Sequence, residues 1–326
     1  MYVETMKRLL RGIGTLLGVV AFAAAAWGWW KNPEHGTIDA RARVDVAGGF
    51  VGSTQGITHY DISGPDSGRT VVLVHGFSVP SYIWDSTVKR LSEAGYRTLR
   101  YDLFGRGWSD RPDAPYDGPM YDAQLNELLD SLHVVGPVDL MGLSFGGFVT
   151  AHYLTTHSAR VRSLTLVDPV ATTATVPGIM TVPVLGPWLW QTRAVPTMPA
   201  GQPPDFLHPE HFPDWVDRYL PQMRFRGFGR ALLRSRITLS KTDFNSLYAQ
   251  AGKTGVPVLL MWGKQDHTVP ILESSVIRRN IPQVEFLPVD SAGHLPHIEQ
   301  SATVHAKMLQ FLAAHGGAPA PPSARP

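Results

Sequence analysis

One short stretch, residues 137–147, constrains this chain more than any other. It reads P-V-D-L-M-G-L-S-F-G-G, so an apolar run leads into a Gly-x-Ser-x-Gly pentapeptide centred on Ser144, and a segment of helical periodicity follows at once. That order predicts a strand, a sharp turn and a helix. A serine on such a turn is held in a strained conformation that exposes its hydroxyl, and the flanking glycines let strand and helix approach each other. Ser144 is therefore the candidate nucleophile.

Short apolar runs rich in valine and leucine recur along the chain. They occupy residues 70–74, 96–101, 134–141, 161–167, 256–262 and 284–289. Because these runs are continuous rather than alternating, they predict strands covered on both faces, joined by helical crossovers in a mostly parallel sheet. Residues 50–53 and 58–62 alternate weakly around glycine-containing turns and predict an opening antiparallel pair. The predicted fold class is α/β with a doubly wound sheet.

Polar residues follow several of these runs directly. In an open parallel sheet the active site gathers beyond the carboxyl ends of the strands. Ser144, Asp266 and His294 each stand just after a run, in the chain order serine, acid, histidine. Asp168 also follows a run and remains an alternative acid.

These motifs together resemble the α/β-hydrolase fold superfamily over roughly residues 50–314. The serine, acid, histidine order is the one associated with that fold. His75-Gly76 is similar to its oxyanion-loop motif, and residues 102–109, D-L-F-G-R-G-W-S, are similar to the Asp-x-x-Gly-x-Gly-x-Ser loop of its lipase, esterase and C–C hydrolase branches. The resemblance implies an eight-stranded type of sheet and a serine hydrolase.

The resemblance also implies a role for each residue. His294 would take the proton of Ser144 and return it to the leaving group, while Asp266 would hold the imidazole tautomer. The backbone N–H groups of Phe77 and Phe145 would bind the oxyanion. No cofactor is implied, and the histidine and carboxylate spacings indicate no metal site. The chain has no cysteine, which excludes thiol catalysis and thiolate metal sites.

The N-terminal segment, residues 1–30, predicts a membrane anchor or a signal peptide. Residues 12–30 carry no charge and follow three basic residues, and as a helix they would span roughly 28 Å, close to the hydrocarbon thickness of a bilayer. The basic side would stay cytoplasmic, with the tryptophans at 27, 29 and 30 at the far interface. A cleaved signal peptide is the alternative, because the alanines at 24–26 fit a cleavage site. The catalytic domain is thus expected to be anchored on the extracytoplasmic side, or secreted.

The rest of the chain divides by composition. Residues 31–170 and 251–315 are expected to form the core, residues 171–250 an insertion, and residues 316–326, rich in glycine, alanine and proline, a disordered tail. In the fold that the chain resembles, such an insertion commonly forms a cap over the nucleophile.

Several residues of the insertion are candidates for substrate contact. Trp188, Trp190 and Met223 could line an apolar substrate channel, or could only fix the insertion to the core. Five arginines between residues 224 and 236 could approach an anionic lipid surface, although a solvated helical face is the commoner explanation.

The sequence therefore predicts a serine hydrolase that cleaves carboxylic esters, especially lipophilic acyl esters, through an acyl-enzyme. Its partners would be a small-molecule or lipid ester and a membrane entered by residues 12–30. A C–C bond hydrolase of the meta-cleavage type and a haloperoxidase-like perhydrolase would use the same three residues and stay open as alternatives, as does a non-catalytic binding module. A net charge of +2 without a lysine or arginine stripe argues against a nucleic-acid partner.

Overall fold

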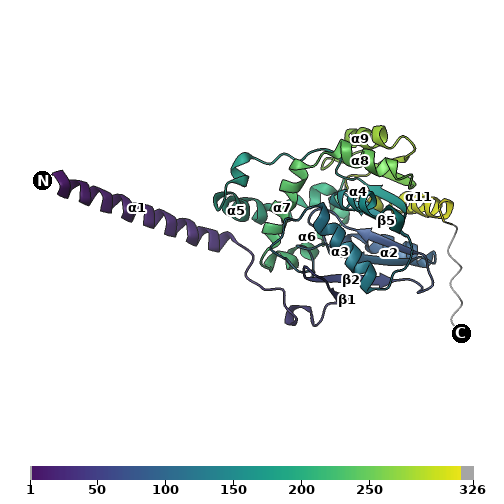
Figure 1. Cartoon of the computed structure of the whole chain (residues 1–326), viewed down its shortest axis with the longest axis horizontal. Helices are drawn as coiled ribbons and strands as arrows, with labels where there is room; N and C mark the ends of the chain where they lie inside the picture. The colour runs from purple at the N-terminus through teal and green to yellow at the C-terminus, as the bar shows by residue number, and fades with distance from the viewer. Residues whose placement is uncertain (1, 317–326) are drawn as a thin grey trace.

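The computed structural model describes residues 2–316. The predicted disordered tail, residues 316–326, lies outside the described residues except for Gly316. The body of the molecule is a sheet with helices on both faces, and a single long helix projects away from it (Figure 1).

The sheet has eight strands in the spatial order β1-β2-β4-β3-β5-β6-β7-β8. Their bounds are β1 Gly49–Gly52, β2 Ile57–Ser63, β3 Thr70–Val74, β4 Arg97–Tyr101, β5 Val138–Leu143, β6 Val161–Val167, β7 Val258–Gly263 and β8 Glu285–Val289. The pairings β1–β2 and β2–β4 are antiparallel, and the others are parallel. The predicted α/β class, with a mostly parallel sheet and an antiparallel opening pair, is confirmed.

The helices separate into two layers that bury two apolar clusters against the sheet. On one face lie α2 (Asp85–Glu93) and α11 (Ser301–Ala314). The other face carries α3 (Gly118–Ser131), α4 (Phe145–Thr156), α8 (Phe244–Lys253) and α9 (Ser274–Asn280). Strand β5 is buried along its whole length between these layers, as its continuous apolar run requires.

The strand that leads to Ser144 is shorter than its apolar run. The run predicts a strand from residue 134, whereas β5 begins at Val138. His133 and Gly136 both have positive φ, at 52° and 89°. These left-handed residues make a turn, so the residues before Val138 cannot join the ladder.

The insertion between β6 and β7 contains helices and 3₁₀ turns. Its helices are α5 (Leu185–Leu189), α6 (Trp215–Tyr219) and α7 (Phe228–Lys241), and a π-helical turn at Trp190–Ala194 continues α5. Helix α8 begins within the last residues of the range 171–250, and its Phe244 packs on Phe148 of α4. The end of that range therefore belongs to the helical layer on the sheet.

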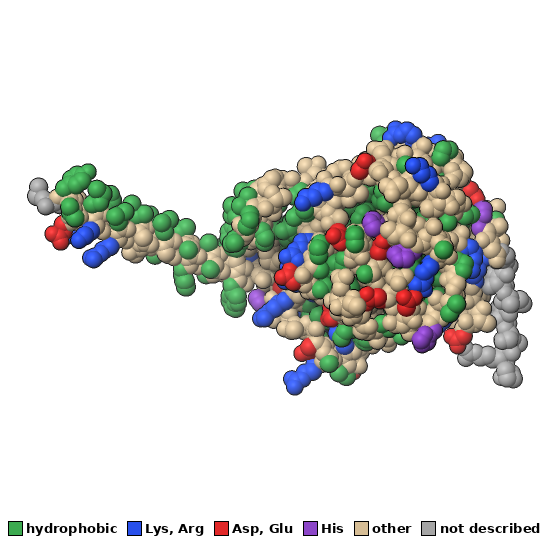
Figure 2. Space-filling view, viewed as in Figure 1, with side chains coloured by type: hydrophobic (Ala, Val, Ile, Leu, Met, Phe, Trp, Pro, Cys, Tyr) green, Lys and Arg blue, Asp and Glu red, His purple; other side chains and the backbone are tan. Residues whose placement is uncertain are grey.

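Helix α1 (Tyr2–Lys31) is long and apolar enough, by length and composition, to cross a membrane, with a mean hydropathy of 1.9 over its best window. None of that window is buried against the rest of the described chain, and Figure 2 shows hydrophobic side chains along it, with charged side chains near its N-terminal end. A signal sequence has the same features.

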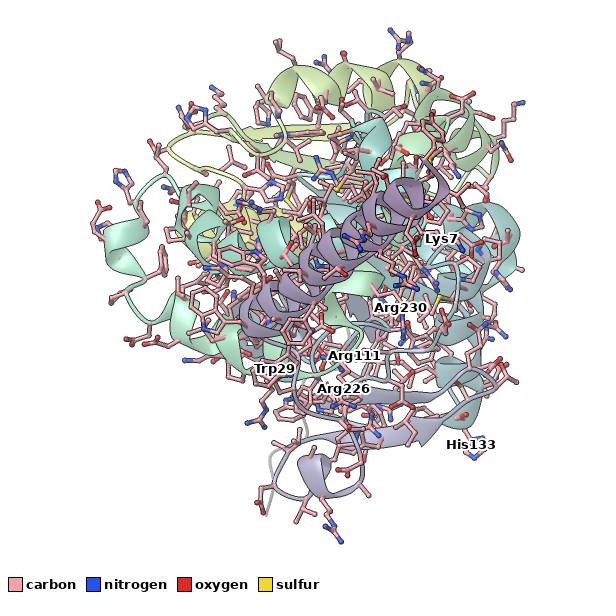
Figure 3. The ribbon with its side chains drawn as sticks, turned by 90° about the vertical axis from the view of Figure 1, so that its left-hand side faces the viewer. Lys7, Trp29, Arg111, His133, Arg226 and Arg230 are labelled. Atoms are coloured by element: carbon pink, nitrogen blue, oxygen red, sulfur yellow. The ribbon has the colours of Figure 1, made fainter. Side chains whose placement is uncertain are left out.

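A buried carboxylate is among the groups that fix the residues after α1 to the insertion, together with a short bridge between Gly36 and Phe225. Glu34 accepts hydrogen bonds from the backbone N–H groups of Gly227 and Gly229, each at 2.6 Å, and from Gln191 Nε2 at 3.0 Å. Gly227 and Gly229 form the N-terminus of α7, where a negative charge is favourable. Figure 3 looks onto this end of the molecule, with α1 in front, and labels Arg226 near Trp29 at the end of α1, where its backbone N–H donates to the Gly36 carbonyl at 2.9 Å.

Replacing Glu34 by alanine is expected to lower the free energy of unfolding by about 3 kcal/mol, since three hydrogen bonds to the carboxylate are lost and the N–H groups of Gly227 and Gly229 are left without an acceptor. Urea unfolding of the full chain in detergent, followed by tryptophan fluorescence, would measure this. The control is Glu93→Ala, at an exposed glutamate, where the change should stay within about 0.5 kcal/mol. Equal effects of the two substitutions would contradict the assignment.

Candidate active site

Ser144 lies on the turn between β5 and α4 in a strained conformation, with φ 52° and ψ −115°. The two glycines of the pentapeptide are required by close approach. A Cβ on Gly142 would lie 2.4 Å from the Gly146 carbonyl oxygen, and a Cβ on Gly146 would lie 2.3 Å from the Val74 carbonyl oxygen. The strand, the helix and β3 thus crowd together and leave the serine at the turn.

Two backbone N–H groups are available beside Ser144. The loop after β3 runs against the serine, because a Cβ on Gly76 would lie 3.4 Å from Ser144 Cβ. Within residues 2–316, the N–H groups of Phe77 and Phe145 donate no hydrogen bond to a protein acceptor. Both are therefore free to bind an oxygen of a ligand at Ser144.

His75 supports this loop through both of its ring nitrogens. Nδ1 donates to the Gly76 carbonyl at 2.9 Å, and Nε2 accepts from the Leu103 N–H at 2.9 Å. Complete burial lowers the pKa of His75 to about 4, so the ring is neutral. Since neither nitrogen is free, His75 fixes the loop and is not placed to transfer a proton.

His294 and Asp266 form a buried pair. His294 Nδ1 lies 2.7 Å from Asp266 Oδ2, and Asp266 Oδ1 accepts from the N–H groups of Thr268 and Val269 at 2.8 and 2.9 Å. Burial by itself lowers the pKa of His294, but the charge and hydrogen bond of Asp266 outweigh it, and the pKa is raised above its ordinary value. The carboxylate therefore fixes the ring and stabilises its protonated form.

Asp168, the alternative acid, lies beside this pair but plays a different part. Its Oδ1 accepts from the Gly263 N–H at 2.8 Å, and it makes no hydrogen bond to His294. Burial, and then the charge of Asp266, raise the pKa of Asp168 well above its ordinary value. Atoms of Asp168, Asp266 and His294 lie within 4.8 Å of one another, a separation that could also suit a cation. His294 Nδ1 is already held by Asp266, and the raised pKa of Asp168 favours its neutral form, which is a poor ligand for a cation.

The segment of the insertion at residues 205–207 is bonded to both loops that carry this pair. Asp205 accepts from Thr268 Oγ1 at 2.5 Å through its side chain and from the His294 N–H at 2.8 Å through its carbonyl. Glu299 accepts from the N–H groups of Leu207 and Gly293 at 2.8 and 2.7 Å. Sequence reasoning missed Asp205 and Glu299, because no local pattern marks bonds between such distant residues.

Two cavities meet at Ser144. One, of about 260 Å³, is lined by Ser144, His294 and Trp190 among others, and the other, of about 330 Å³, extends from Ser144 toward Leu239. Phe77 and the exposed Arg236 line both. The structure thus brings Ser144 and His294 to one cavity wall, with the Phe77 loop beside them.

Only part of the predicted apolar channel reaches these cavities. Trp190 lines the first of them, but Trp188 lies against α1, where its Nε1 donates to the Ala24 carbonyl at 3.3 Å. Met223 is buried in the apolar cluster that contains Tyr219 and Phe228. Trp188 and Met223 line neither of these two cavities, an arrangement that favours the alternative in which they only fix the insertion in place.

The other candidate histidines lie outside this arrangement. His297 is buried, its Nε2 lies 3.1 Å from the Ile83 carbonyl oxygen, and burial lowers its pKa to about 3. His267 is exposed although it follows Asp266 in sequence. Neither lines a cavity with Ser144.

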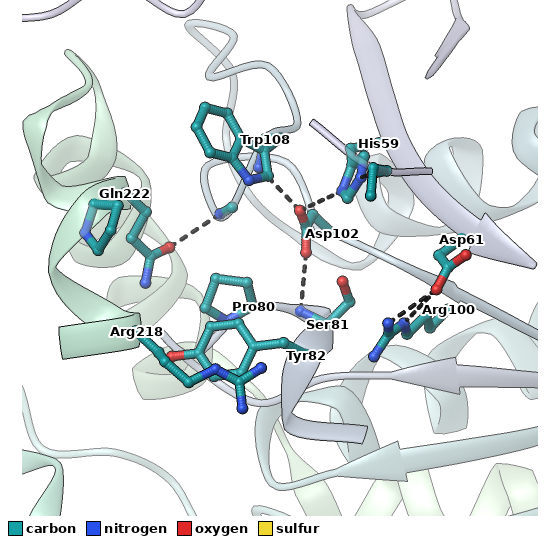
Figure 4. Close-up of a pocket in the computed structure, with 13 residues that line it drawn as sticks. His59, Asp61, Pro80, Ser81, Tyr82, Arg100, Asp102, Trp108, Arg218 and Gln222 are labelled. Atoms are coloured by element: carbon teal, nitrogen blue, oxygen red, sulfur yellow. Dashed lines mark hydrogen bonds and ion pairs between the residues drawn. The ribbon is translucent and has the colours of Figure 1, made fainter. Parts of the chain in front are cut away.

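A separate cavity of about 230 Å³ is organised around Asp102 (Figure 4). Asp102 accepts from His59 Nδ1 at 2.8 Å and from the N–H groups of Ser81 and Trp108, each at 2.9 Å. His59 Nε2 bonds to the Ala47 carbonyl at 2.8 Å, so both ring nitrogens donate. Although burial opposes ionisation of both groups, their pairing raises the pKa of His59 and lowers that of Asp102. Asp102 is therefore a structural residue that fixes the loop after β4.

Comparison with known proteins agrees with this fold. A family model described as "alpha/beta hydrolase fold" matches residues 69–301. A pimeloyl-[acyl-carrier protein] methyl ester esterase of Neisseria meningitidis is 27% identical over 256 residues, 76% of this chain and 78% of that enzyme. A cis-3-alkyl-4-alkyloxetan-2-one decarboxylase of Xanthomonas campestris is 27% identical over 284 residues, 77% of this chain and 89% of that enzyme.

Solved structures show the same fold. An enol-lactonase from Burkholderia xenovorans LB400 superposes with a TM-score of 0.71 at 20% identity, covering 81% of this chain and 100% of that one. A meta-cleavage product hydrolase from Pseudomonas fluorescens IP01 superposes with a TM-score of 0.68 at 21% identity, covering 82% of this chain and 98% of that one. The similar proteins thus catalyse several different reactions.

Proposed function

This chain belongs to the alpha/beta hydrolase fold family, and we propose that it is a serine hydrolase that cleaves carboxylic esters, with lipophilic acyl esters as its substrates. One observation carries the proposal. Ser144, on a strained turn, lines the same cavity as His294, and His294 Nδ1 is held by Asp266 at 2.7 Å. An alcohol nucleophile, an oriented base and two free N–H donors are the groups that acyl transfer requires.

In the first half of the reaction, His294 Nε2 takes the proton of Ser144 Oγ as this oxygen attacks the ester carbonyl. The N–H groups of Phe77 and Phe145 donate to the oxyanion of the tetrahedral intermediate, an interaction worth about 3 kcal/mol for each donor. His294 then gives the proton to the alcohol, which leaves, and the acyl group stays on Ser144. Asp266 stabilises the imidazolium between these transfers.

In the second half, a water molecule takes the place of the alcohol. His294 removes its proton as it attacks the acyl-enzyme carbonyl, and the same two N–H groups receive the second oxyanion. Collapse of this intermediate returns the proton to Ser144 Oγ and releases the acid. The reaction consumes the ester and one water molecule, releases an alcohol and an acid, and returns Ser144 and His294 to their starting states.

We also propose that residues 171–250 act as a cap that shapes the substrate cavity. Support comes from Trp190, which lines the cavity at Ser144 and is fixed by a hydrogen bond from its Nε1 to the Gly229 carbonyl at 2.9 Å. The hydrogen bonds that Asp205 accepts from the His294 N–H and that Glu299 accepts from the N–H groups of Leu207 and Gly293 hold residues 205–207 of the insertion against the His294 loop. A rigid indole in this place would limit the length of the acyl chain that fits.

Replacing Trp190 by alanine is expected to move the preference toward longer acyl chains. Each additional methylene that the enlarged cavity buries should raise kcat/KM about threefold to fourfold, the equivalent of about 0.8 kcal/mol. The matched control is Trp188→Ala, because Trp188 lies against α1 and not in the cavity. If both variants shift the optimum equally, the cavity assignment of Trp190 fails.

The ester assignment itself is tested with a p-nitrophenyl series from acetate to palmitate and the full chain in detergent. Hydrolysis that depends on Ser144 and His294 would support it. A folded wild-type protein that cleaves no member of the series would overturn it. The C–C hydrolase and perhydrolase alternatives would then be tested with a vinylogous diketone and with a carboxylic acid plus peroxide.

We further propose that α1 is retained as a membrane anchor with the catalytic domain on the extracytoplasmic side. The uncharged run of residues 12–30, preceded by Lys7, Arg8 and Arg11, supports this orientation. A protein released by cleavage near residues 24–26 is the alternative. The mass of the mature N-terminal peptide distinguishes the two.

A further inference from the structure

The insertion exposes an apolar loop, defined here as Ile179, Val182, Val184 and Leu185. Their side chains are 47%, 43%, 85% and 43% exposed. The loop lies within a run that carries no charge from residue 169 to residue 192. Val184 has φ 66°, a strained conformation for a β-branched residue. Figure 2 shows hydrophobic side chains gathered at the end of the body beside α1. An exposed patch of this kind marks an interaction surface.

The helix that follows the apolar loop contacts the last turns of α1. Helix α5 begins at Leu185 and carries Trp188, whose Nε1 donates to the Ala24 carbonyl at 3.3 Å. A Cβ on Gly28 would lie 2.7 Å from the same nitrogen, so the indole also touches the last turn of α1. Ala24 precedes the tryptophans at 27, 29 and 30 by three to six residues, which places it about 5–9 Å deeper in the membrane than those tryptophans.

Three arginines lie in the turn that continues α5 and beside the residues that follow α1. Arg193 ends the uncharged run, and Arg224 and Arg226 lie close to Gly36, just after α1. All three are exposed, and none forms an ion pair with a carboxylate among the residues that the structure describes. Each such cation gains about 1 kcal/mol near an anionic lipid surface.

We propose that the apolar loop and α5 are embedded in the leaflet from which α1 emerges, so that the insertion rests on the membrane; this rests on the proposed retention of α1. A lipid bilayer is the favoured partner of this surface because α5 contacts α1 at a level closer to the membrane centre than the interfacial tryptophans of α1. The uncharged residues 169–192 would lie in the acyl region of the leaflet, and Arg193, which follows them, would lie at the lipid headgroups. A protein partner would not explain this match of depth and charge.

This placement has a consequence for the substrate. Trp190 lines the cavity at Ser144 and stands two residues after Trp188, which contacts α1. The cavity wall is thus continuous in sequence with the embedded helix. A lipophilic ester would reach the cavity from the leaflet and not through bulk water.

The absence of cysteine makes a direct test possible. Single cysteines replace Val184, Val182, Leu16 or Val135 in the full chain, carry an environment-sensitive fluorophore, and are placed in nanodiscs of phosphatidylcholine and phosphatidylglycerol. Leu16 reports insertion of α1. Val135 is the matched control, since it is 95% exposed and precedes the N-terminal end of β5, whereas Ser144 follows the C-terminal end of the same strand. Intact mass and thermal unfolding verify each variant.

The expected result is a blue-shifted emission at positions 184, 182 and 16 that brominated lipids quench, and an unshifted, unquenched emission at position 135. Quenching at 16 without quenching at 184 and 182 would overturn the inference while α1 remains an anchor. A blue shift at 184 that brominated lipids do not quench would assign the loop to a protein contact and would also overturn it. An absence of quenching at position 16 would contradict the proposal that α1 is a membrane anchor, and the inference that rests on it would fail as well.

Discussion

Replacing Ser144 by alanine is expected to lower kcat/KM for a p-nitrophenyl ester by at least about 10⁴-fold, because no other group on this turn can form the acyl-enzyme. The residual rate would come from binding and from the N–H groups of Phe77 and Phe145. Steady-state hydrolysis measures the loss, and a fluorophosphonate that labels wild type but not the variant identifies the reacting atom.

Stability provides the control for this variant. Alanine keeps a Cβ at φ 52°, so Ser144→Ala should unfold close to wild type. Ser144→Gly removes the Cβ and should raise the free energy of unfolding by about 1 kcal/mol while remaining inactive. A stabilised, inactive glycine variant would show that strain is maintained for the nucleophile. Activity of the alanine variant within tenfold of wild type would remove Ser144 from the proposed mechanism.

Replacing Asp266 by asparagine is expected to lower kcat about 10⁴-fold, because the amide favours the wrong tautomer of His294 and no longer stabilises the imidazolium. The direction of the pH dependence follows from the same contact. His294 must be neutral to act as a base, and Asp266 raises its pKa, so the acid limb of the wild-type kcat/KM profile should lie above the ordinary value of 6.5. In the Asp266→Asn variant His294 is still buried but no longer faces the charge of Asp266, so its pKa falls. The acid limb of the kcat/KM profile should therefore move to lower pH.

Asp168→Asn is the matched control for this experiment. Burial, and then the charge of Asp266, raise the pKa of Asp168 well above its ordinary value, which favours the neutral carboxyl that an amide resembles, and an amide can still accept from the Gly263 N–H. This variant should keep activity within about fivefold of wild type, because only an indirect contact changes. If Asp168→Asn loses more activity than Asp266→Asn, the assignment of the acid is reversed.

Much of the fold was predictable because its signals are local. Continuous apolar runs marked the strands, and the glycines at 142 and 146 marked the turn that carries Ser144. Strand ends in a parallel sheet share one edge, so serine, acid and histidine after three such runs were expected to gather. The chain belongs to the alpha/beta hydrolase fold family, in agreement with the motifs. The roles proposed for Ser144, Asp266 and His294 stay predictions that the variants above test.

Tertiary structure decided what local pattern could not. Asp168 and Asp266 both follow a strand, and only the packing of the His294 loop places Asp266 at 2.7 Å from its Nδ1. Trp188 and Trp190 lie in the same apolar segment, yet Trp188 contacts α1 and Trp190 lines the cavity at Ser144. Residues two apart in a helix point to different sides, so the two indoles meet different partners. Asp205 joins loops far from it in sequence. Backbone conformation is encoded by neighbouring residues, whereas the partner of a side chain depends on which distant segments the whole fold brings beside it.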